Sequence, residues 1–186
     1  MEELQNHLAQ TLKTERALRG WSLSRAAEIT GVSKAMLGQI ERAESSPTIA
    51  TLWKIATGFN LPFSLFIESH AAPQDTPRHP QTLPAFRQPN QAMQVQTLFS
   101  YDSAIDFEML VIELAAGASS ESAPHEPGVI EHIIVIEGEL VLNVSGIWQP
   151  LAAGETLRFQ ADCPHAYHNT GAQTVRFYNL IHYPKH

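Results

Sequence analysis

The sequence is poor in cysteine and in long apolar segments, and each shortage excludes a class of protein. Its 186 residues contain one cysteine, Cys163, which excludes an internal disulfide framework of the secreted type. It has no run of about 18 apolar residues, and its acidic Met-Glu-Glu start lacks the basic and apolar segments of a signal peptide. We therefore expect a soluble, cytoplasmic protein with no membrane partner.

Charged residues are also scarce, at 17% of the chain, and they are unevenly distributed. Residues 1–70 hold seven basic and seven acidic side chains, whereas residues 71–186 hold five and twelve, so the net charge of -7 belongs to the second part. Seven of the nine histidines lie there as well. The acidic total argues against a general nucleic-acid coat protein, but a small DNA reader needs only a local cationic face.

A proline-rich segment separates the two parts. Residues 69–92 contain five of the twelve prolines and show neither helical nor strand periodicity. Long irregular connections inside one compact domain are uncommon, so this segment is predicted to be a linker, with an ordered loop draped over one domain as the alternative. The sequence thus predicts one domain over residues 1–68 and another over 93–186.

The first domain carries the periodicity of five short helices. An apolar stripe marks a helix over residues 3–19, and the segment 21–42 follows the pattern of helix, tight turn and helix. One more helix begins at Thr48, and a last short one follows Pro62. Serines stand at two helix starts and glycines at two helix ends, namely Ser22, Ser33, Gly20 and Gly31. A generic helical bundle would share the apolar stripes, so the turn residues favour the more specific arrangement.

Residues 6–67 resemble the helix-turn-helix domains of the phage-repressor, or xenobiotic-response-element (XRE), family. The residues that carry the resemblance are Ala27, Gly31, Val32, Leu37, Ile40, Glu41 and the pair Ser46-Pro47. Residues 20–64 are similar in particular to bacterial regulators of sulfur utilisation. The resemblance implies a close helix crossing at the small Ala27 and a partly buried ion pair between Arg16 and Glu41.

In this family the second helix of the motif enters the major groove, with residues near its N-terminus at base edges. The family pattern assigns Lys34, Ala35 and Gln39 to these positions, where lysine suits guanine, alanine a thymine methyl and glutamine adenine. The family often has an amide where this chain has Ala35, so we expect a different base preference there. The candidate phosphate contacts are Ser22, Ser33, Ser45 and Ser46, and Arg42 is a further candidate for contact with DNA. A serine at a helix start serves equally well as a cap.

The second domain changes to short runs rich in β-branched and aromatic residues, which predict a closed antiparallel barrel. The expected strands are 94–99, 107–114, 129–136, 139–144, 147–151, 156–159 and 175–182. Alternate side chains of a strand share a face, so His125 and Glu131 are expected on one face and His165 on a second strand facing them. Two imidazoles and a carboxylate suit a divalent metal, with zinc favoured and iron as an alternative. A polar ligand pocket without metal is the other interpretation.

The same residues resemble the two motifs of the cupin family over residues 93–184, which implies a jelly-roll fold. The first motif is matched by His125, Glu131 and Gly138, and the second by Gly154, Pro164, His165 and Asn169. The family's second histidine is replaced by Pro127, which cannot bind a metal. At most three motif ligands therefore remain, unless Tyr167, His182 or Cys163 substitutes.

A DNA reader joined to a small-molecule barrel predicts a one-component transcription factor rather than an enzyme. Its partners would be a double-stranded operator, a second copy of the chain and a small effector, for which the resemblance suggests a sulfur-containing amino acid or a relative. The effector pocket is predicted to include Tyr167, Asn169 and His182. Two alternatives are a metal-dependent, dioxygenase-like enzyme tethered to DNA and a scaffold whose barrel only dimerises.

Overall fold

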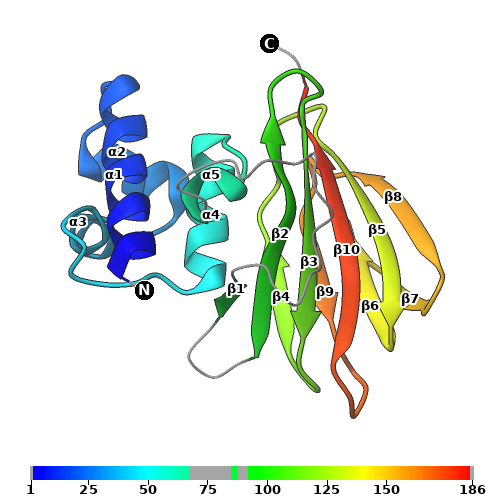
Figure 1. The fold of residues 1–186 in the computed structure, drawn as a ribbon. Coiled ribbons are helices and arrows are strands. Elements are labelled where there is room, and N and C mark those ends of the chain that lie inside the picture. The colour runs from blue at the N-terminus through cyan, green and yellow to red at the C-terminus, as the bar shows by residue number, and fades with distance from the viewer. Residues whose placement is uncertain (1, 68–84, 88–91, 185–186) are drawn as a thin grey trace. The chain divides into compact units, whose positions relative to one another are not determined.

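The computed structural model describes residues 2–67, 85–87 and 92–184, which divide into two compact units (Figure 1). The first unit spans Met1–Ala72 and the second Pro73–His186. The segment 69–92, expected to be a linker, lies outside the described residues except for 85–87 and Ala92. In the part of the chain that is described, no helix has the length and apolar character needed to cross a bilayer.

Residue types at the helix ends explain where the helices of the first unit start and stop. The helices are α1 (Glu2–Leu18), α2 (Leu23–Thr30), α3 (Lys34–Glu41), α4 (Ile49–Phe59) and α5 (Ser64–Ile67). The N-caps expected at Ser22 and Ser33 are confirmed, because each side chain accepts a hydrogen bond from the backbone N–H three residues on. Thr48 caps α4 in the same way. Gly31 ends α2 with a φ of 67°, a left-handed conformation that glycine adopts without steric cost.

The close crossing between α2 and α4 differs in detail from the expectation. Ala26 is the fully buried alanine of α2, whereas Ala27 is only half-buried. Successive helix residues point about 100° apart, so a family offset does not decide which of two adjacent alanines packs inward. Gly58 of α4 also approaches the end of α2 closely, since an added Cβ would lie 2.9 Å from the Thr30 Cα. A glycine therefore permits this contact between α2 and α4.

An ion pair joins α1 to the end of α3. Arg16 Nε lies 2.5 Å from Glu41 Oε1, and Arg16 Nη2 lies 2.8 Å from Glu41 Oε2. Arg16 Nη1 also donates to the Trp21 carbonyl at 2.7 Å. The two charged side chains are only 19% and 8% exposed, which confirms the expected partly buried pair.

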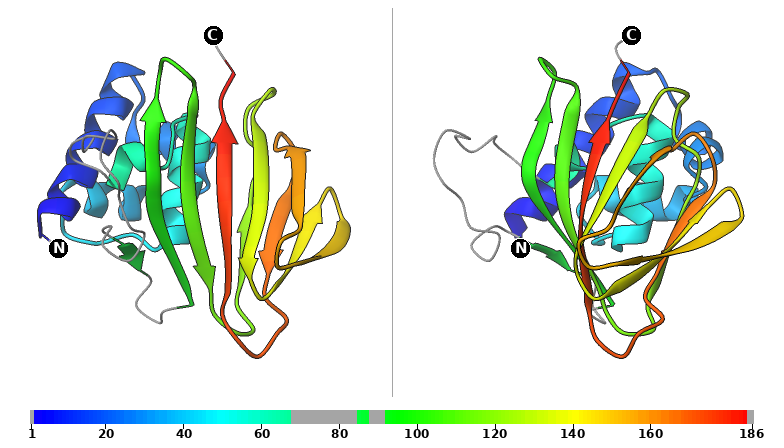
Figure 2. Two further views of the ribbon diagram at one scale, coloured as in Figure 1. Left: turned by 45° about the vertical axis from the view of Figure 1, so that its right-hand side comes forward. Right: turned by 90° about the vertical axis from the view of Figure 1, so that its right-hand side faces the viewer.

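The second unit consists of antiparallel strands in two sheets that face each other (Figure 2). The six-stranded sheet has the order β1-β2-β3-β10-β5-β8, and the four-stranded sheet has the order β4-β9-β6-β7. The strands are β1 (Ala85–Arg87), β2 (Met93–Asp102), β3 (Phe107–Leu114), β4 (Ser119–Ser122), β5 (Ile130–Glu137), β6 (Glu139–Val144), β7 (Ile147–Ala152), β8 (Thr156–Gln160), β9 (His165–His168) and β10 (Val175–His182).

Three expectations for this unit are corrected. The ladders between the described strands do not join the two sheets, so the closed barrel expected from the sequence is not formed by these ladders. β1 lies inside the segment for which no strand was expected, because three residues are too few to show periodicity and their pairing with β2 is a tertiary contact. β4 was also missed, since its sequence Ser-Ser-Glu-Ser has no apolar alternation.

The central strand β10 defines the face on which the functional residues lie. Its residues alternate between buried and half-buried, with Phe177, Asn179 and Ile181 on the inner face. β10 pairs with β3 on one side and β5 on the other, so that Ile181 lies opposite both Glu108 and Glu131. Two fully buried acidic residues therefore share the inner face with the apolar core of this unit.

Replacing Glu41 with glutamine is expected to lower the free energy of unfolding by about 3 kcal/mol, because Arg16 keeps its charge in a partly buried position without a counter-charge. Urea melts of the wild-type and variant proteins measure this loss. Glu28→Gln is the matched control: its pair with Arg25 is 59% and 67% exposed, so its loss should stay below about 1 kcal/mol. Equal losses in the two variants would contradict the prediction.

Candidate functional site

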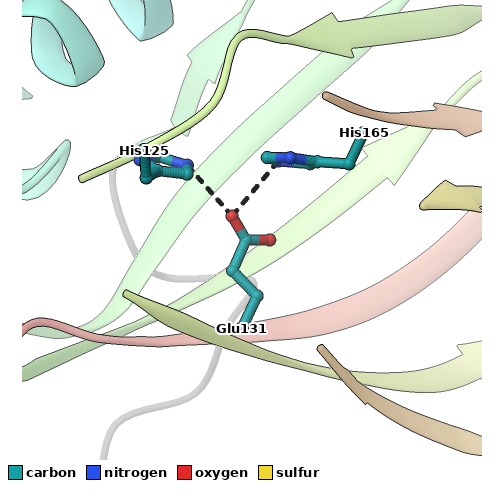
Figure 3. Close-up of side chains that lie close together, drawn as sticks. All are labelled: His125, Glu131 and His165. Atoms are coloured by element: carbon teal, nitrogen blue, oxygen red, sulfur yellow. Dashed lines mark ion pairs between the residues drawn. The ribbon is translucent and has the colours of Figure 1, made fainter. Parts of the chain in front are cut away.

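Three side chains of metal-binding type meet in the interior of the second unit (Figure 3). His125 comes from the loop before β5, Glu131 from β5, and His165 from the start of β9. One ligand atom of each lies within 4.8 Å of the others. Glu131 Oε1 is 3.1 Å from His125 Nε2 and 3.4 Å from His165 Nε2. The structure thus brings together the three residues that the sequence singled out.

His125 reaches this cluster from a loop and not from a strand. The sequence placed it on one strand face with Glu131, but β5 begins only at Ile130. Pro127 and Gly128 turn the chain between them, with a φ of 95° at Gly128. Proline has no N–H with which to extend a ladder, so the expected strand cannot continue back to His125. The juxtaposition is present, but the reason given for it was wrong.

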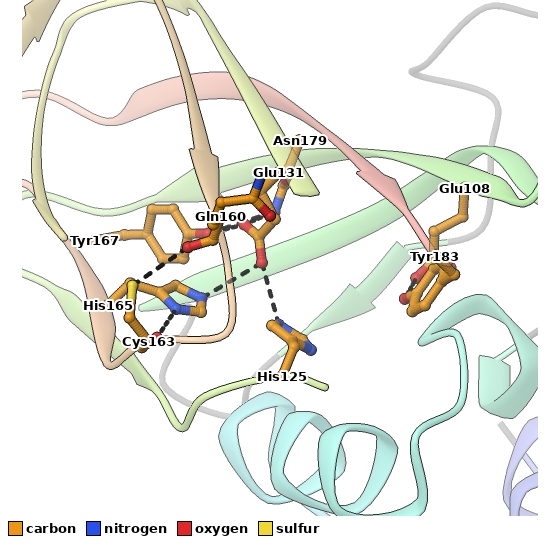
Figure 4. Close-up of polar contacts among 9 residues, drawn as sticks. All are labelled: Glu108, His125, Glu131, Gln160, Cys163, His165, Tyr167, Asn179 and Tyr183. Carbon is orange, nitrogen blue, oxygen red and sulfur yellow. Dashed lines mark hydrogen bonds and ion pairs between the residues drawn. The ribbon is translucent and has the colours of Figure 1, made fainter. Parts of the chain in front are cut away.

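Glu131 is a fully buried carboxylate whose two oxygens have different neighbours (Figure 4). Burial by itself raises the pKa of Glu131, but hydrogen bonding and electrostatic attraction from His125 and His165 outweigh it and hold the pKa well below its usual range. The hydroxyl of Tyr167 and Nδ2 of Asn179 donate to Oε2, the amide at 2.9 Å. The other oxygen, Oε1, faces the two imidazoles.

The hydrogen bonds around the cluster fix which atoms carry protons. Nδ1 of His165 lies 2.9 Å from the Cys163 carbonyl, which can only accept, so Nδ1 carries the proton and neutral His165 presents a lone pair on Nε2. Burial lowers the pKa of His165, but its contacts with Glu131 and then with Cys163 raise it overall. Burial and the charge of Glu131 raise the pKa of Tyr167 well above its usual value, so its hydroxyl remains a donor.

Unpartnered polar atoms test whether the cluster fits a metal ion. Nε2 of His125, Nε2 of His165 and Oε1 of Glu131 are buried and face one another, and none of them has a hydrogen-bond partner outside the cluster. Buried polar atoms nearly always have a partner, so three lone-pair donors that face one another indicate a site for a cation. Imidazole and carboxylate are donors for both zinc and ferrous iron. The residues therefore fit a divalent transition metal, and the donor set is compatible with either ion.

Asn169, which the sequence assigned to the effector pocket, is engaged by the backbone. Its amide nitrogen donates to the carbonyls of Leu114 and Gln173 at 2.9 and 2.7 Å. Its amide oxygen accepts from the Gly171 N–H at 2.9 Å. Both ends of the amide thus hold the turn after β9. These hydrogen bonds give Asn169 a structural role, and its contact with an effector stays a prediction.

Three side chains were considered as substitutes for a histidine at Pro127. Tyr167 contacts the cluster by donating to Glu131, whereas His182 and Cys163 lie apart from it. His182 is on the opposite face of β10 from the inward-facing Asn179. This position also separates His182 from the pocket residues with which it was grouped. The thiol of Cys163 donates to the Gln160 carbonyl at 3.3 Å. Neither His182 nor Cys163 belongs to the metal-binding group found among the described residues.

Sequence reasoning missed Asn179, although its amide contacts Glu131 directly. Asn179 lies within the apolar strand β10, and its side chain is fully buried. A signal for it was present. Strand alternation places it on the same face as Phe177 and Ile181, and an amide on a buried apolar face requires a polar partner.

A second candidate surface is the solvent face of α3 in the first unit. Lys34, Ala35 and Gln39, the predicted base-reading residues, are exposed, whereas Leu37 and Ile40 are buried in the core. The helix therefore presents the three predicted readers to solvent. Their side chains are available to a duplex without any unfolding of the unit.

The predicted phosphate contacts lie around this helix, and most of them make local hydrogen bonds. Ser22 and Ser33 cap the two helices of the motif, and Ser45 Oγ lies 3.9 Å from Met36 Sδ. Ser46 is exposed.

Arg42 lies beside the same helix and is paired with a carboxylate. Its guanidinium forms a bidentate ion pair with Glu44, with Nε 2.8 Å from Oε1 and Nη2 2.7 Å from Oε2. Both side chains of this pair are more than half exposed. An exposed ion pair contributes little stability, so Arg42 can exchange the carboxylate for a phosphate at small cost.

Both units match known families. The chain matches the helix-turn-helix family over residues 12–66 and the cupin domain family over residues 110–181. It is 57% identical to the HTH-type transcriptional regulator SutR of Escherichia coli (strain K12), covering 100% of this chain and 99% of that protein. The HTH-type transcriptional regulator PuuR of the same strain is 26% identical, over 87% of this chain and 86% of its own.

Solved structures extend the likeness to three dimensions. An HTH_3 family transcriptional regulator from Vibrio cholerae is 42% identical with a TM-score of 0.81, and the match covers 99% of each chain. The Cupin_2 domain of an XRE family transcriptional regulator from Enterobacter cloacae is 49% identical with a TM-score of 0.50, over 51% of this chain and 100% of that one. Since the match to SutR runs through both units, the chain belongs to the DNA-binding helix-turn-helix transcriptional regulators that carry a cupin domain.

Proposed function

We propose that this protein is a transcriptional regulator whose cupin domain senses a small metabolite at a bound divalent metal. The observation that carries the proposal is a set of three buried donor atoms, on His125, Glu131 and His165. They face one another and have no hydrogen-bond partner outside the set. A metal held by three protein donors keeps coordination positions for a further ligand, as catalytic and sensing sites do and closed structural sites do not. A sulfur-containing amino acid or a relative is the first effector class to test, and zinc or iron the first metals.

The DNA-binding half of the proposal rests on α3. Two recognition helices must enter major grooves on one side of the duplex about 34 Å apart, so the protein would act as a homodimer on a near-palindromic operator. The exposed Lys34, Ala35 and Gln39 would meet base edges. The four candidate serines and Arg42 would contact the DNA backbone and fix the position of the protein on the duplex. A DNA-tethered, dioxygenase-like enzyme is the less supported alternative, because SutR and PuuR are both named as transcriptional regulators.

Replacing Gln39 with alanine is expected to weaken operator binding by about 1 to 3 kcal/mol and to relax the base preference at one position per half-site. The side chain is exposed, so the substitution should leave folding intact. Fluorescence anisotropy and selection from a randomised operator measure the two effects. Gln10→Ala, an equally exposed glutamine on α1, is the control and should behave like the wild type. An unchanged base preference in Gln39→Ala would remove this residue from the reading surface.

Elemental analysis of tag-free protein is expected to give close to one transition metal per chain, lost in His125→Ala and in His165→Ala, because each variant removes one of three donors. His168→Ala is the matched control, since His168 lies on the same strand as His165 but on the opposite face. Metal content that is unchanged in both His125→Ala and His165→Ala would contradict the metal site. Retention in Glu131→Gln alone would remove only that residue from the donor set.

Effector and operator binding are expected to change each other's affinity by the same factor, about 5 to 150-fold for a coupling of about 1 to 3 kcal/mol. Thermal shift with sulfur-containing amino acids and related metabolites identifies an effector, and its titration with and without operator measures the factor. His165→Ala should abolish the response while effector-free DNA binding stays nearly intact. Identical titrations, together with turnover of the compound, would favour the enzyme alternative instead.

A further inference from the structure

The two oxygens of Glu131 are treated unequally by the protein (Figure 4). Oε2 accepts hydrogen bonds from the Tyr167 hydroxyl and from Asn179 Nδ2, the latter at 2.9 Å. Oε1 has no hydrogen-bond partner outside the cluster and faces the imidazoles of His125 and His165, with Nε2 atoms at 3.1 and 3.4 Å. The hydroxyl and amide donors thus serve one oxygen of the carboxylate and leave the other to the two metal-binding side chains.

Both donors are themselves held in place. Tyr167 is 2% exposed, and its ring stacks on Phe177 with centroids 5.4 Å apart. Asn179 is fully buried and lies opposite Ile133 in the ladder between β10 and β5. The Asn179 amide nitrogen is also 3.5 Å from the Tyr167 hydroxyl, so the two donors converge on one point. Glu131 and Asn179 come from the six-stranded sheet and Tyr167 from the four-stranded sheet, so these hydrogen bonds connect the two sheets.

We propose that Tyr167 and Asn179 are positioning residues that hold Glu131 as a monodentate metal ligand through Oε1 and thereby keep metal coordination positions open for an effector. The inference rests on the metal site of the proposed function and adds the residues that set its denticity. A carboxylate can bind a cation through one oxygen or both. Here a bidentate mode would require Oε2 to give up at least one of its two hydrogen bonds. Partners of this kind orient a ligand and raise its affinity for the metal.

This role predicts a different result from a purely structural one. If the two hydrogen bonds only stabilise the fold, removing either lowers the melting temperature of the metal-free protein and leaves metal affinity unchanged. If they position Glu131, removing either weakens metal binding and changes the coordination of the bound ion. Cobalt(II) is a suitable probe, because its visible absorption depends on the number of coordinating atoms.

The experiment titrates cobalt(II) into metal-free, full-length protein, with affinity measured by chelator competition. Tyr167→Phe and Asn179→Leu are each expected to weaken binding by about 10 to 100-fold. The double variant should in addition show the weaker absorption of a higher coordination number, because both oxygens of Glu131 are then free to bind. Tyr178→Phe is the matched control: it removes a hydroxyl next to Asn179 on the opposite, outward face of β10, and should match the wild type.

The outcomes distinguish failure of the positioning role from failure of the metal site itself. Tyr167→Phe keeps the ring that packs on Phe177, so it carries the test even if Asn179→Leu does not fold. Wild-type affinity and absorption in Tyr167→Phe would overturn the positioning role and leave the metal site standing. Wild-type protein that takes up no cobalt, zinc or iron would overturn the metal site, and with it the positioning role of Tyr167 and Asn179.

Discussion

The cupin domain is arranged around the burial of one negative charge, the carboxylate of Glu131. An unpaired carboxylate in an apolar interior is very unfavourable, so neighbouring groups must supply hydrogen bonds or positive charge. Four side chains do so, and they reach Glu131 from the loop before β5, from β9 and from β10. Because β9 belongs to one sheet and β10 to the other, satisfying this charge also ties the two sheets together. The site and the stability of the fold therefore depend on the same contacts.

In the first unit, an ion pair likewise helps to hold α3, the proposed recognition helix, in place. The pair between Arg16 and Glu41 anchors the end of α3 to α1, and the close approach at Gly58 brings α4 against α2. Both contacts lie away from the exposed face that carries Lys34 and Gln39. The reading surface proposed for α3 would need a rigid support so that its side chains meet base edges at fixed spacing. In this unit the support includes helix packing and the partly buried pair of Arg16 and Glu41.

Features that depend on residues close together in the sequence were predicted well. Features that depend on contacts between distant parts of the chain were not. Caps such as Ser33 and the periodicity of the helices and longer strands are encoded within a few residues, so their positions follow from the sequence. The grouping of His125 with Glu131 was also predicted, but on a strand that the turn at Pro127 interrupts. Closure of the sheets and the role of Asn179 depend on which distant strands become neighbours. No spacing along the chain specifies that neighbourhood.

The shortest strand has a mechanical consequence. β1 joins β2 through only three register positions at the edge of the six-stranded sheet, and it is the described strand that follows the segment between the two units. A ladder this short opens at lower free energy than the long ladders behind it. A pull transmitted along the chain from an operator-bound head would peel β1 away before it loaded β2 or the strands that hold Glu131. Opening of this short ladder would therefore relieve such tension before it reached the interior of the sheet.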